Sequence, residues 1–257
     1  MTGLPLQGRL LWYELLTSDI KAAEAFYGAV VGWSFSSFPG APMPYDVINR
    51  PGGVGVGGVM KIPDGMNFPP HWEMYIGVEN IDETVAKIER LGGSGLSPMM
   101  EMANVGRFRT MKDPQGAVFA ILQPSSSEHK PETDPVEGDA SWHELYTTDA
   151  PAAAKFYSDV FGWKQFDPMD MGPMGKYYMW GRTGMLGGMM NKTPDMAQVP
   201  TSWGLYFRVP DVNAGAERVR ANGGQVLQDP MEVPGGDWVV NCMDPQGAAF
   251  SLHHKKG

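Results

Sequence analysis

Two tryptophan–glutamate pairs are the first residues whose types and spacing could do chemistry. Glu14 follows Trp12 by two residues, and Glu144 follows Trp142 in the same way. Residues two apart on a strand point to one face, so each pair sets an aromatic ring beside a carboxylate. A carboxylate in an apolar pocket acquires a raised pKa and can act as a general base or bind a cationic or hydroxyl-bearing ligand. Glu14 and Glu144 are therefore catalytic candidates, although bonds to backbone or a role in positioning the two halves would equally explain their recurrence.

The candidates for ligand contacts share an aromatic or hydrogen-bonding side chain on an expected strand. The tyrosines among them could orient an oxygen-rich ligand. The tryptophans at 72 and 203 could line a pocket wall or pack in the core. The predicted ligand-binding residues are Trp12, Tyr45, Trp72, Glu73, Trp142, His143, Tyr177 and Trp203.

These residues recur because the chain is a tandem repeat. Many residues of 12–33 recur 130 positions later, among them Asp19, the Phe26-Tyr27 pair and Gly32-Trp33, and the segment 113–117, DPQGA, returns unchanged at 244–248. Such self-similarity predicts two copies of one module. The stretch PSSSEHKPETDPVEGD at 124–139 is rich in Pro, Ser and acids, which is typical of a solvated linker. We therefore expect module 1 at 1–123, a linker at 124–139 and module 2 at 140–257.

Each module is expected to be doubled again. In module 1, alternation predicts a first strand and an apolar face at helical spacing predicts a helix that starts at Ser18 or Asp19 and stops at Gly32. The expected strands are 9–17, 33–38, 44–49, 54–61, 72–78, 95–102, 105–112 and 117–122, with a second helix at 82–91. The order is βαβββ, occurring four times in the chain. The predicted fold class is α+β, with two curled sheets that each leave one face for a ligand.

With these motifs the chain resembles the glyoxalase/bleomycin resistance/dioxygenase superfamily, also called vicinal oxygen chelate, in its two-module actinobacterial type. The resemblance rests on the helix from Asp19 to Tyr27 with Gly32-Trp33 behind it, on Gly92-Gly93 and on 113–116, all of which recur. It covers nearly the whole chain outside the linker. It implies half-open barrel modules whose enzymes often hold a divalent metal with His, Glu or Gln.

The positions that the resemblance assigns to metal ligands do not carry a ligand set here. They fall at Trp12, Glu73 and Ala120 in module 1 and at Trp142, Gly204 and Ser251 in module 2. One carboxylate cannot hold a metal, so we expect no cofactor and a lost metal site. A divalent metal stays the alternative, since a register slip of one residue would bring in His71 and His143.

Three further motifs have structural interpretations. The two DPQGA segments are expected to be turns, because Pro presets a turn and Gly permits positive φ. The glycine-rich stretch 52–58 lacks the Lys-Ser/Thr and the helix of a phosphate loop, so we expect a glycine-bent strand. His129 falls in the linker, and His253 and His254 near the C-terminus are expected to be solvated or to form a weak adventitious metal site.

Composition limits the compartment and the partners. The chain has 257 residues and a net charge of -9, so it should repel nucleic acid and anionic membranes. No apolar run approaches a membrane span and the N-terminus does not read as a signal peptide. Cys242 is the only cysteine, which fits a cytoplasmic protein, and it is expected to be a small half-buried residue. We expect a small-molecule ligand, no nucleic acid, no membrane, and either a monomer with paired modules or a homodimer.

Three functions compete. The lack of ligands at the metal positions favours a module that binds a small apolar or aromatic molecule in its sheet pockets. The alternative is an enzyme, either a glyoxalase-type lyase or isomerase or a dioxygenase-like protein with displaced metal ligands or a glutamate base. An interaction platform has no positive feature in the sequence.

Overall fold

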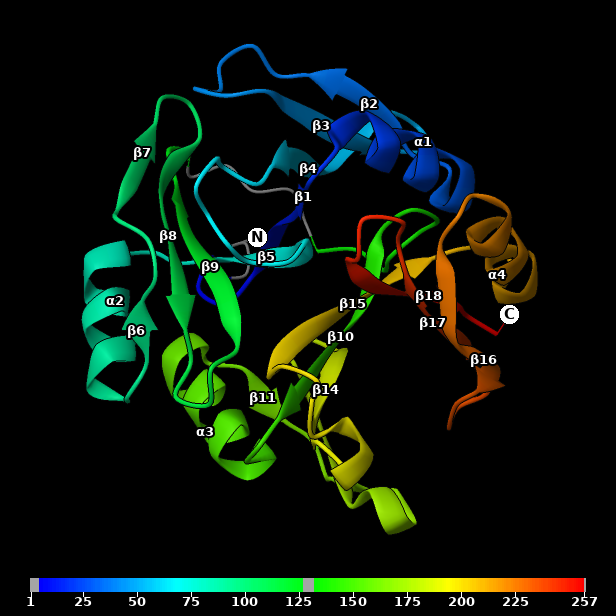
Figure 1. The fold of residues 1–257 in the computed structure, drawn as a ribbon. Coiled ribbons are helices and arrows are strands. Elements are labelled where there is room, and N and C mark those ends of the chain that lie inside the picture. The colour runs from blue at the N-terminus through cyan, green and yellow to red at the C-terminus, as the bar shows by residue number, and fades with distance from the viewer. Residues whose placement is uncertain (1–4, 127–131, 257) are drawn as a thin grey trace. The chain divides into compact units, whose positions relative to one another are not determined.

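The computed structural model describes residues 5–126 and 132–256 and contains two mixed sheets, one in each half of the chain (Figure 1). In the first sheet the strand order is β2-β3-β4-β1-β5-β9-β8-β6, and β7 also pairs with β8. In the second sheet it is β11-β13-β14-β10-β15-β18-β17-β16, and β12 also pairs with β13. The α+β class and the fourfold βαβββ order are thus confirmed.

The elements of the first half are β1 (Leu10–Thr17), α1 (Ile20–Val31), β2 (Ser34–Ser37), β3 (Tyr45–Arg50), β4 (Val54–Lys61), β5 (His71–Gly77), α2 (Ile81–Arg90), β6 (Ser94–Gly95), β7 (Met100–Met102), β8 (Gly106–Lys112) and β9 (Val118–Pro124). Those of the second half are β10 (Ala140–Thr147), α3 (Ala150–Phe161), β11 (Lys164–Gln165), β12 (Met169–Asp170), a 3-10 turn (Gly172–Met174), β13 (Lys176–Gly181), β14 (Met185–Asn191), a second 3-10 turn (Pro194–Met196), β15 (Ser202–Arg208), α4 (Val212–Ala221), β16 (Gln225–Glu232), β17 (Trp238–Met243) and β18 (Ala249–His254).

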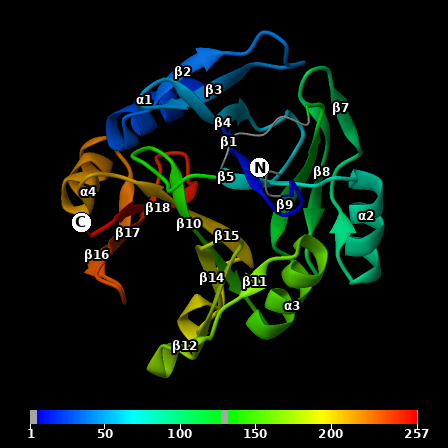
Figure 2. The same ribbon diagram turned by 180° about the vertical axis from the view of Figure 1, so that it is seen from behind.

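The chain folds into two compact units, and their boundaries do not coincide with those of the two sheets. One unit comprises residues 1–11, 74–133 and 143–203, and the other comprises 12–73, 134–142 and 204–257. Each unit therefore combines one βαβββ motif from each half of the chain. In the first unit α2 lies near α3, and in the second α1 lies beside α4, as both views of the ribbon show (Figures 1 and 2).

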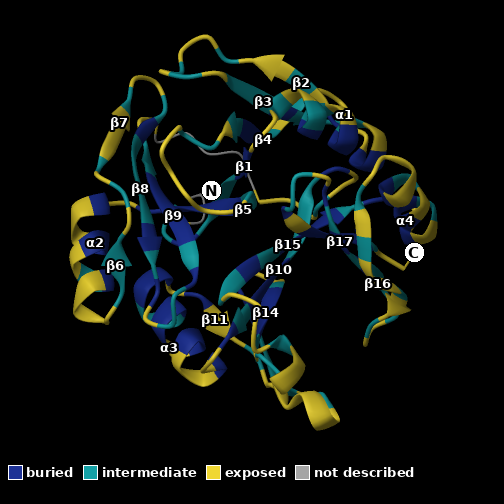
Figure 3. Cartoon of the chain, in the orientation of Figure 1, coloured by how far each residue is buried: buried dark blue, intermediate teal, exposed yellow. Residues whose placement is uncertain are grey.

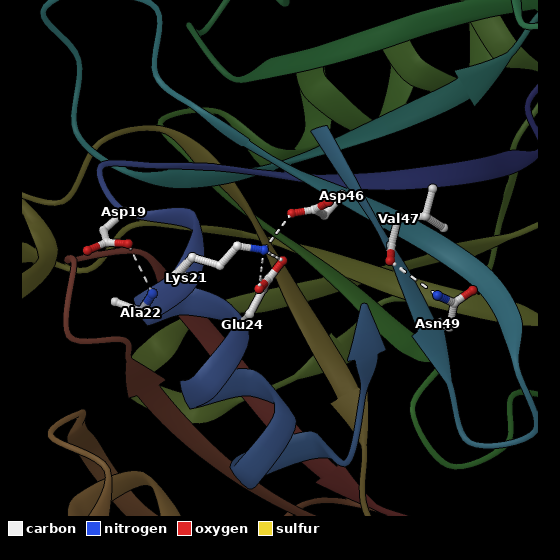
Figure 4. A network of polar contacts seen from close by, with 7 residues as sticks. All are labelled: Asp19, Lys21, Ala22, Glu24, Asp46, Val47 and Asn49. Carbon is white, nitrogen blue, oxygen red and sulfur yellow. Dashed lines mark hydrogen bonds and ion pairs between the residues drawn. The ribbon is translucent and has the colours of Figure 1, made fainter. Parts of the chain in front are cut away.

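Helix α1 illustrates why the predicted boundaries hold. Asp19 Oδ1 accepts a hydrogen bond from the Ala22 N–H at 3.0 Å, which satisfies a donor that the first turn leaves free (Figure 4). Gly32, at φ 84, ends the helix in the left-handed conformation. Lys21 then bridges Glu24 at 2.8 Å and Asp46 of β3 at 3.1 Å, also drawn in Figure 4.

One predicted strand is broken. The expected strand at 95–102 is two short pieces, β6 and β7. The N–H groups of Leu96 and Ser97 both approach the Thr110 carbonyl, at 2.9 and 3.4 Å, and Pro98 has no N–H to continue the ladder. The ladder therefore stops after Gly95 and resumes at Met100.

An aromatic core fills each unit and explains the recurring Phe-Tyr and Gly-Trp pairs. In the second unit Tyr27 stacks on Trp33 with centroids 5.5 Å apart, and Trp72 meets both rings edge-on. In the first unit Tyr157 stacks on Trp163 at 5.3 Å, and Trp203 meets both rings edge-on. Figure 3 shows the helices buried on one side and exposed on the other, as expected for a packed amphipathic face.

A buried tyrosine–aspartate bond joins the two motifs within the second unit. Tyr27 Oη donates to Asp244 Oδ2 at 3.1 Å and accepts from Trp72 Nε1 at 3.0 Å. Asp244 Oδ1 accepts from the backbone N–H groups of Gln246 and Ala248. The DPQGA segment is thus a turn, as predicted, and its aspartate anchors the helix of the other module.

The first unit contains the same bond in the reciprocal sense. Tyr157 Oη donates to Asp113 Oδ2 at 3.1 Å and accepts from Trp203 Nε1 at 2.9 Å. Asp113 Oδ1 accepts from three backbone N–H groups of its turn. Burial raises the pKa of both carboxyls, Asp113 and Asp244, against the hydrogen bonds that lower it. The fold tolerates the burial of these two carboxyl groups because each of their oxygens accepts a hydrogen bond.

The predicted linker is anchored where the structure describes it. Residues 127–131, which include His129, lie outside the described residues. In the first unit Glu132 pairs with Arg182 and, at 3.4 Å, with Arg9. The described linker residues 132–134 and 136–137 are exposed, and the Glu132 carboxylate is held by two largely buried guanidinium groups.

The end of the same segment is fixed in the second unit. The Gly138 carbonyl accepts from Trp33 Nε1 at 2.8 Å, and the Asp139 carboxylate pairs with Arg50 at 2.9 Å. The backbone carbonyl of Asp139 accepts a hydrogen bond from the backbone N–H of Arg208 on β15. These contacts lead the chain directly into β10.

Among the described residues, no helix has both the length and the apolar character to cross a bilayer.

Candidate functional site

The candidate site in the second unit is a chain of polar groups across β1 and β3. Trp12 Nε1 donates to Tyr45 Oη at 2.8 Å, and Tyr45 Oη donates to Glu14 Oε2 at 3.3 Å. Glu14 is 7% exposed, and the two rings are half-buried. Burial, with the Glu14 charge second, raises the pKa of Tyr45 far above its ordinary value, so the phenol stays protonated. The three predicted residues therefore form one hydrogen-bonded group.

Glycine in β4 makes room for this group. β1 and β4 are parallel, with Glu14 paired to Gly58. A Cβ at Gly58 would lie 2.6 Å from Tyr45 Cε1 and closer still to Cζ and Oη, so the ring lies directly over the glycine. A Cβ at Gly55 would meet the Trp12 ring at 3.7 Å. The predicted glycine-bent strand is thus a surface on which two aromatic rings rest.

The first unit repeats part of this arrangement. Glu144 is 8% exposed, accepts a hydrogen bond from Tyr146 Oη, and pairs in register with Gly188 of β14. The Tyr177 ring lies over Gly188, where a Cβ would overlap it. Tyr146 was not predicted, although it lies two residues beyond Glu144 on the same face of β10. Trp142, which belongs to the second unit, is half-buried.

His143 lies on the opposite face of β10 from Glu144. Its Nδ1 bonds the Leu186 carbonyl at 2.8 Å, and its ring tilts against Trp180 in the aromatic core of the first unit. Burial lowers the pKa of His143 to about 4, so the ring is neutral at physiological pH. In the parallel ladder of β10 and β14, His143 pairs with Gly187. A ligand contact for His143 stays a prediction, and its observed partners are core groups.

The other predicted ligand contacts are buried. Trp72 and Trp203 donate to the buried tyrosines described above and are 6% and 7% exposed. That places both indoles in the aromatic cores, the structural role that the sequence left open. Glu73, beside Trp72 on β5, is 5% exposed.

At two of the positions that the resemblance assigns to metal ligands, the side chains make hydrogen bonds within the protein. An indole N–H has no lone pair for coordination, and Trp12 Nε1 already donates to Tyr45. Ser251 donates to the Asn241 side chain at 2.8 Å. Across residues 5–126 and 132–256, no three His, Cys, Asp or Glu side chains gather in a way that could hold a metal ion.

The expectation that His253 is solvated is wrong. Instead of being solvated, His253 is 7% exposed and lies between two side chains of the second unit. Its Nδ1 is 2.7 Å from Ser141 Oγ, and its Nε2 is 2.9 Å from Asp237 Oδ2. Sequence reasoning missed this group because Ser141 and His253 are 112 residues apart and no local spacing links them. Cys242 is fully buried rather than half-buried, and burial raises its pKa to about 12.

An open cavity of about 640 Å³ lies in the first unit between the start of α2 and the end of α3. Cations and carboxylates both line it, among them Lys87, Lys164, Arg182, Glu83 and Asp159. It does not include the tryptophan–glutamate pairs. Sequence analysis gave no sign of it.

Family models match both halves of the chain. Residues 140–252 match the glyoxalase/bleomycin resistance protein/dioxygenase superfamily, and residues 13–122 match a glyoxalase-like domain. The protein CFP32 of Mycobacterium tuberculosis, named as a glyoxylase, is 33% identical over 96% of this chain and 94% of its own length.

Two further similarities extend the comparison. The anthracycline biosynthesis protein DnrV of Streptomyces peucetius is 27% identical over 95% of this chain and 92% of its own. A Mn(II)-bound glyoxalase from Novosphingobium aromaticivorans has the same fold, with a TM-score of 0.66, at 15% identity over 96% of this chain and 82% of that one. At that identity the likeness extends to the fold alone.

Proposed function

Because the chain belongs to the glyoxalase/bleomycin resistance protein/dioxygenase superfamily, we propose that it binds a small aromatic molecule bearing a hydroxyl or a positive charge. The binding surface is the Trp12–Tyr45–Glu14 group of the second unit. The observation that supports this most directly is a buried carboxylate bonded to a phenol, beside a half-buried indole, with the phenol ring lying over Gly58 of β4.

Each of these groups has a role in the proposed complex. The rings of Trp12 and Tyr45 offer flat apolar area for stacking against a ligand ring. Glu14 accepts a hydrogen bond from a ligand hydroxyl or ammonium, and a charge-assisted bond of this kind is about twice as strong as a neutral one. Glu144 with Tyr146 and Tyr177 offers a second, related surface in the first unit.

We propose that binding does not use a metal at the family's ligand positions. The support is chemical: a tryptophan replaces the ligand on the first strand of both halves, and Ala120 or Ser251 stands on the last strand. The fold neighbour bound to Mn(II) shows that the fold itself is compatible with a metal. The proposal that binding needs no metal therefore rests on which side chains stand at these positions, and not on the fold.

A glyoxalase-type lyase or isomerase is the second candidate. It is favoured by the name of CFP32 as a glyoxylase and by the Tyr45–Glu14 hydrogen bond, which sets a carboxylate where it could remove a proton. In this case Glu14 would be the general base and Tyr45 would orient the substrate oxygen. Retained metal and turnover of a hemithioacetal would distinguish it from a binding protein.

The test combines native mass spectrometry and metal analysis of untagged protein with ligand titration. A panel of hydroxylated and amino-substituted one- to four-ring aromatics is titrated against tryptophan fluorescence. We expect saturable quenching and no stoichiometric transition metal. A stoichiometric metal, or no binding across the panel together with hemithioacetal turnover, would replace this proposal by the enzymatic one.

Site variants localise the binding. Glu14→Gln removes a charge-assisted bond and should weaken binding roughly 10- to 100-fold, whereas Tyr45→Phe should weaken it about 2- to 10-fold. The matched control is Glu101→Gln, a glutamate on the exposed strand β7. If all three variants bind like the parent, the ligand site lies elsewhere.

A further inference from the structure

We propose that Ser141, His253 and Asp237 form a second site, in which Ser141 is a nucleophile for acyl transfer from small activated esters. All three residues belong to the second unit and none is part of the Trp12–Tyr45–Glu14 group. Ser141 lies near the start of β10, His253 is on the last strand β18, and Asp237 ends the turn before β17.

The geometry matches the order of roles in serine nucleophile activation. Ser141 Oγ is 2.7 Å from His253 Nδ1, within the range of a good O–H to nitrogen bond. His253 Nε2 is 2.9 Å from Asp237 Oδ2. Nucleophile, base and orienting carboxylate are therefore in line, an arrangement recognised by geometry and roles rather than by sequence position.

The carboxylate decides the tautomer of the histidine. With Asp237 ionised, His253 Nε2 carries the proton and donates it, which leaves the Nδ1 lone pair facing Ser141. The Ser141 hydroxyl also lies 3.3 Å from the Tyr206 carbonyl, a longer contact than the one to Nδ1. Either ring nitrogen can serve as the base, provided that the other one donates to the carboxylate.

Asp237 is itself held in place. Its Oδ1 accepts the backbone N–H of Lys256 at 2.9 Å, while Oδ2 faces the histidine. The His253 and Lys256 bonds hold the pKa of Asp237 below its ordinary value against partial burial. Burial lowers the pKa of His253, so the base is neutral near pH 7. The base is thus oriented and correctly protonated before any substrate arrives.

Positive charge is available beside the base. Arg208 of β15 pairs in register with His253, and Arg208 lowers the pKa of both His253 and Asp237. Among residues 5–126 and 132–256, Arg208 Nε belongs to the few buried polar atoms that lack a hydrogen-bond partner. We assign Arg208 to stabilise the negative charge that develops on the substrate carbonyl oxygen.

The proposed step balances without a cofactor. Ser141 Oγ attacks the ester carbonyl carbon as its proton passes to His253 Nδ1. The bond from the carbonyl carbon to the alcohol oxygen breaks, and the His253 proton goes to the leaving alkoxide. Water then attacks the acyl-serine by the same route, so that ester and water become acid and alcohol.

The test uses the full chain with p-nitrophenyl acetate and a fluorophosphonate probe. We expect a burst of p-nitrophenolate and a covalent adduct that peptide mass spectrometry maps to Ser141. Ser141→Ala should abolish both, while Ser202→Ala, a serine bonded only to a backbone carbonyl at the start of β15, should leave them unchanged. An adduct confined to other residues, or none in folded protein, overturns the proposal.

Asp237→Asn separates catalysis from packing. As a positioning residue, Asp237 should change the pH profile and lower the acylation rate roughly 10²- to 10⁴-fold at an unchanged circular dichroism spectrum. A purely structural role would alter the unfolding midpoint but leave the rate per folded molecule and its pH dependence unaltered. That second result also overturns the proposal, whatever the outcome for aromatic ligands at Glu14.

Discussion

Replacing Gly58 by alanine tests whether the Tyr45 ring lies over β4. A Cβ at this position would be 2.6 Å from Cε1 of the ring and closer still to the hydroxyl. Ordinary carbon contacts are about 3.5 to 4.0 Å, so the ring must move by roughly 1 Å or more. That movement breaks the bonds from Trp12 to Tyr45 and from Tyr45 to Glu14.

The expected loss follows from those two bonds. A neutral hydrogen bond contributes about 1 kcal/mol and one to a charged group about 1.5 to 3 kcal/mol. Part of this loss is offset, because alanine lowers the conformational entropy of the unfolded chain relative to glycine and so stabilises the folded state by about 0.4 to 1 kcal/mol. The free energy of unfolding should therefore fall by about 2 to 3 kcal/mol, and aromatic ligand binding should weaken with it.

Urea unfolding followed by circular dichroism measures this change, with Gly184→Ala as the control. A Cβ at Gly184 would meet nothing within 4 Å, so its midpoint should stay close to the parent value. In a Tyr45→Ala background the clash is gone, so Gly58→Ala should cost much less there. Equal cost in both backgrounds, or none in the parent, would refute the placement of the ring.

Three other predictions concern the buried polar groups. Tyr27→Phe and Tyr157→Phe should each lower the free energy of unfolding by about 1 to 3 kcal/mol in urea titrations, because each leaves an indole N–H and a buried carboxylate short of a partner; unchanged midpoints would contradict the observed bonds. Burial raises the pKa of Asp113 and Asp244, so their contribution to stability is fully present below pH 3.8 and is lost as pH rises through the folded-state pKa. Asp113→Asn should flatten this acid-range dependence in pH-resolved urea titrations, and an unaltered slope would count against it. Cys242, with a pKa of about 12, should resist iodoacetamide at pH 8 until the protein is unfolded, as intact-mass analysis would show.

The sequence by itself determined the local structure of this protein. Self-similarity at an offset of 130 reveals the repeat. The caps at Asp19 and Gly32 and the turns at 113–117 and 244–248 are each encoded within a few residues, through periodicity, capping oxygens and glycine. Period-two spacing also predicted that Trp12 and Glu14 share a face, and the structure joins both through Tyr45. The broken strand at 95–102 is the exception, because its end depends on a pairing with β8.

Only the tertiary structure decided how distant segments meet. Nothing near Tyr27 in the sequence indicates that it bonds Asp244, 217 residues away, and nothing near Ser141 indicates His253. Such contacts depend on which strands pair and on which motifs share a core, and a βαβββ motif can bury its apolar face against more than one identical partner. Because the four motifs have nearly the same pattern, their sequences cannot distinguish these partners, and the choice is made by packing across the whole chain.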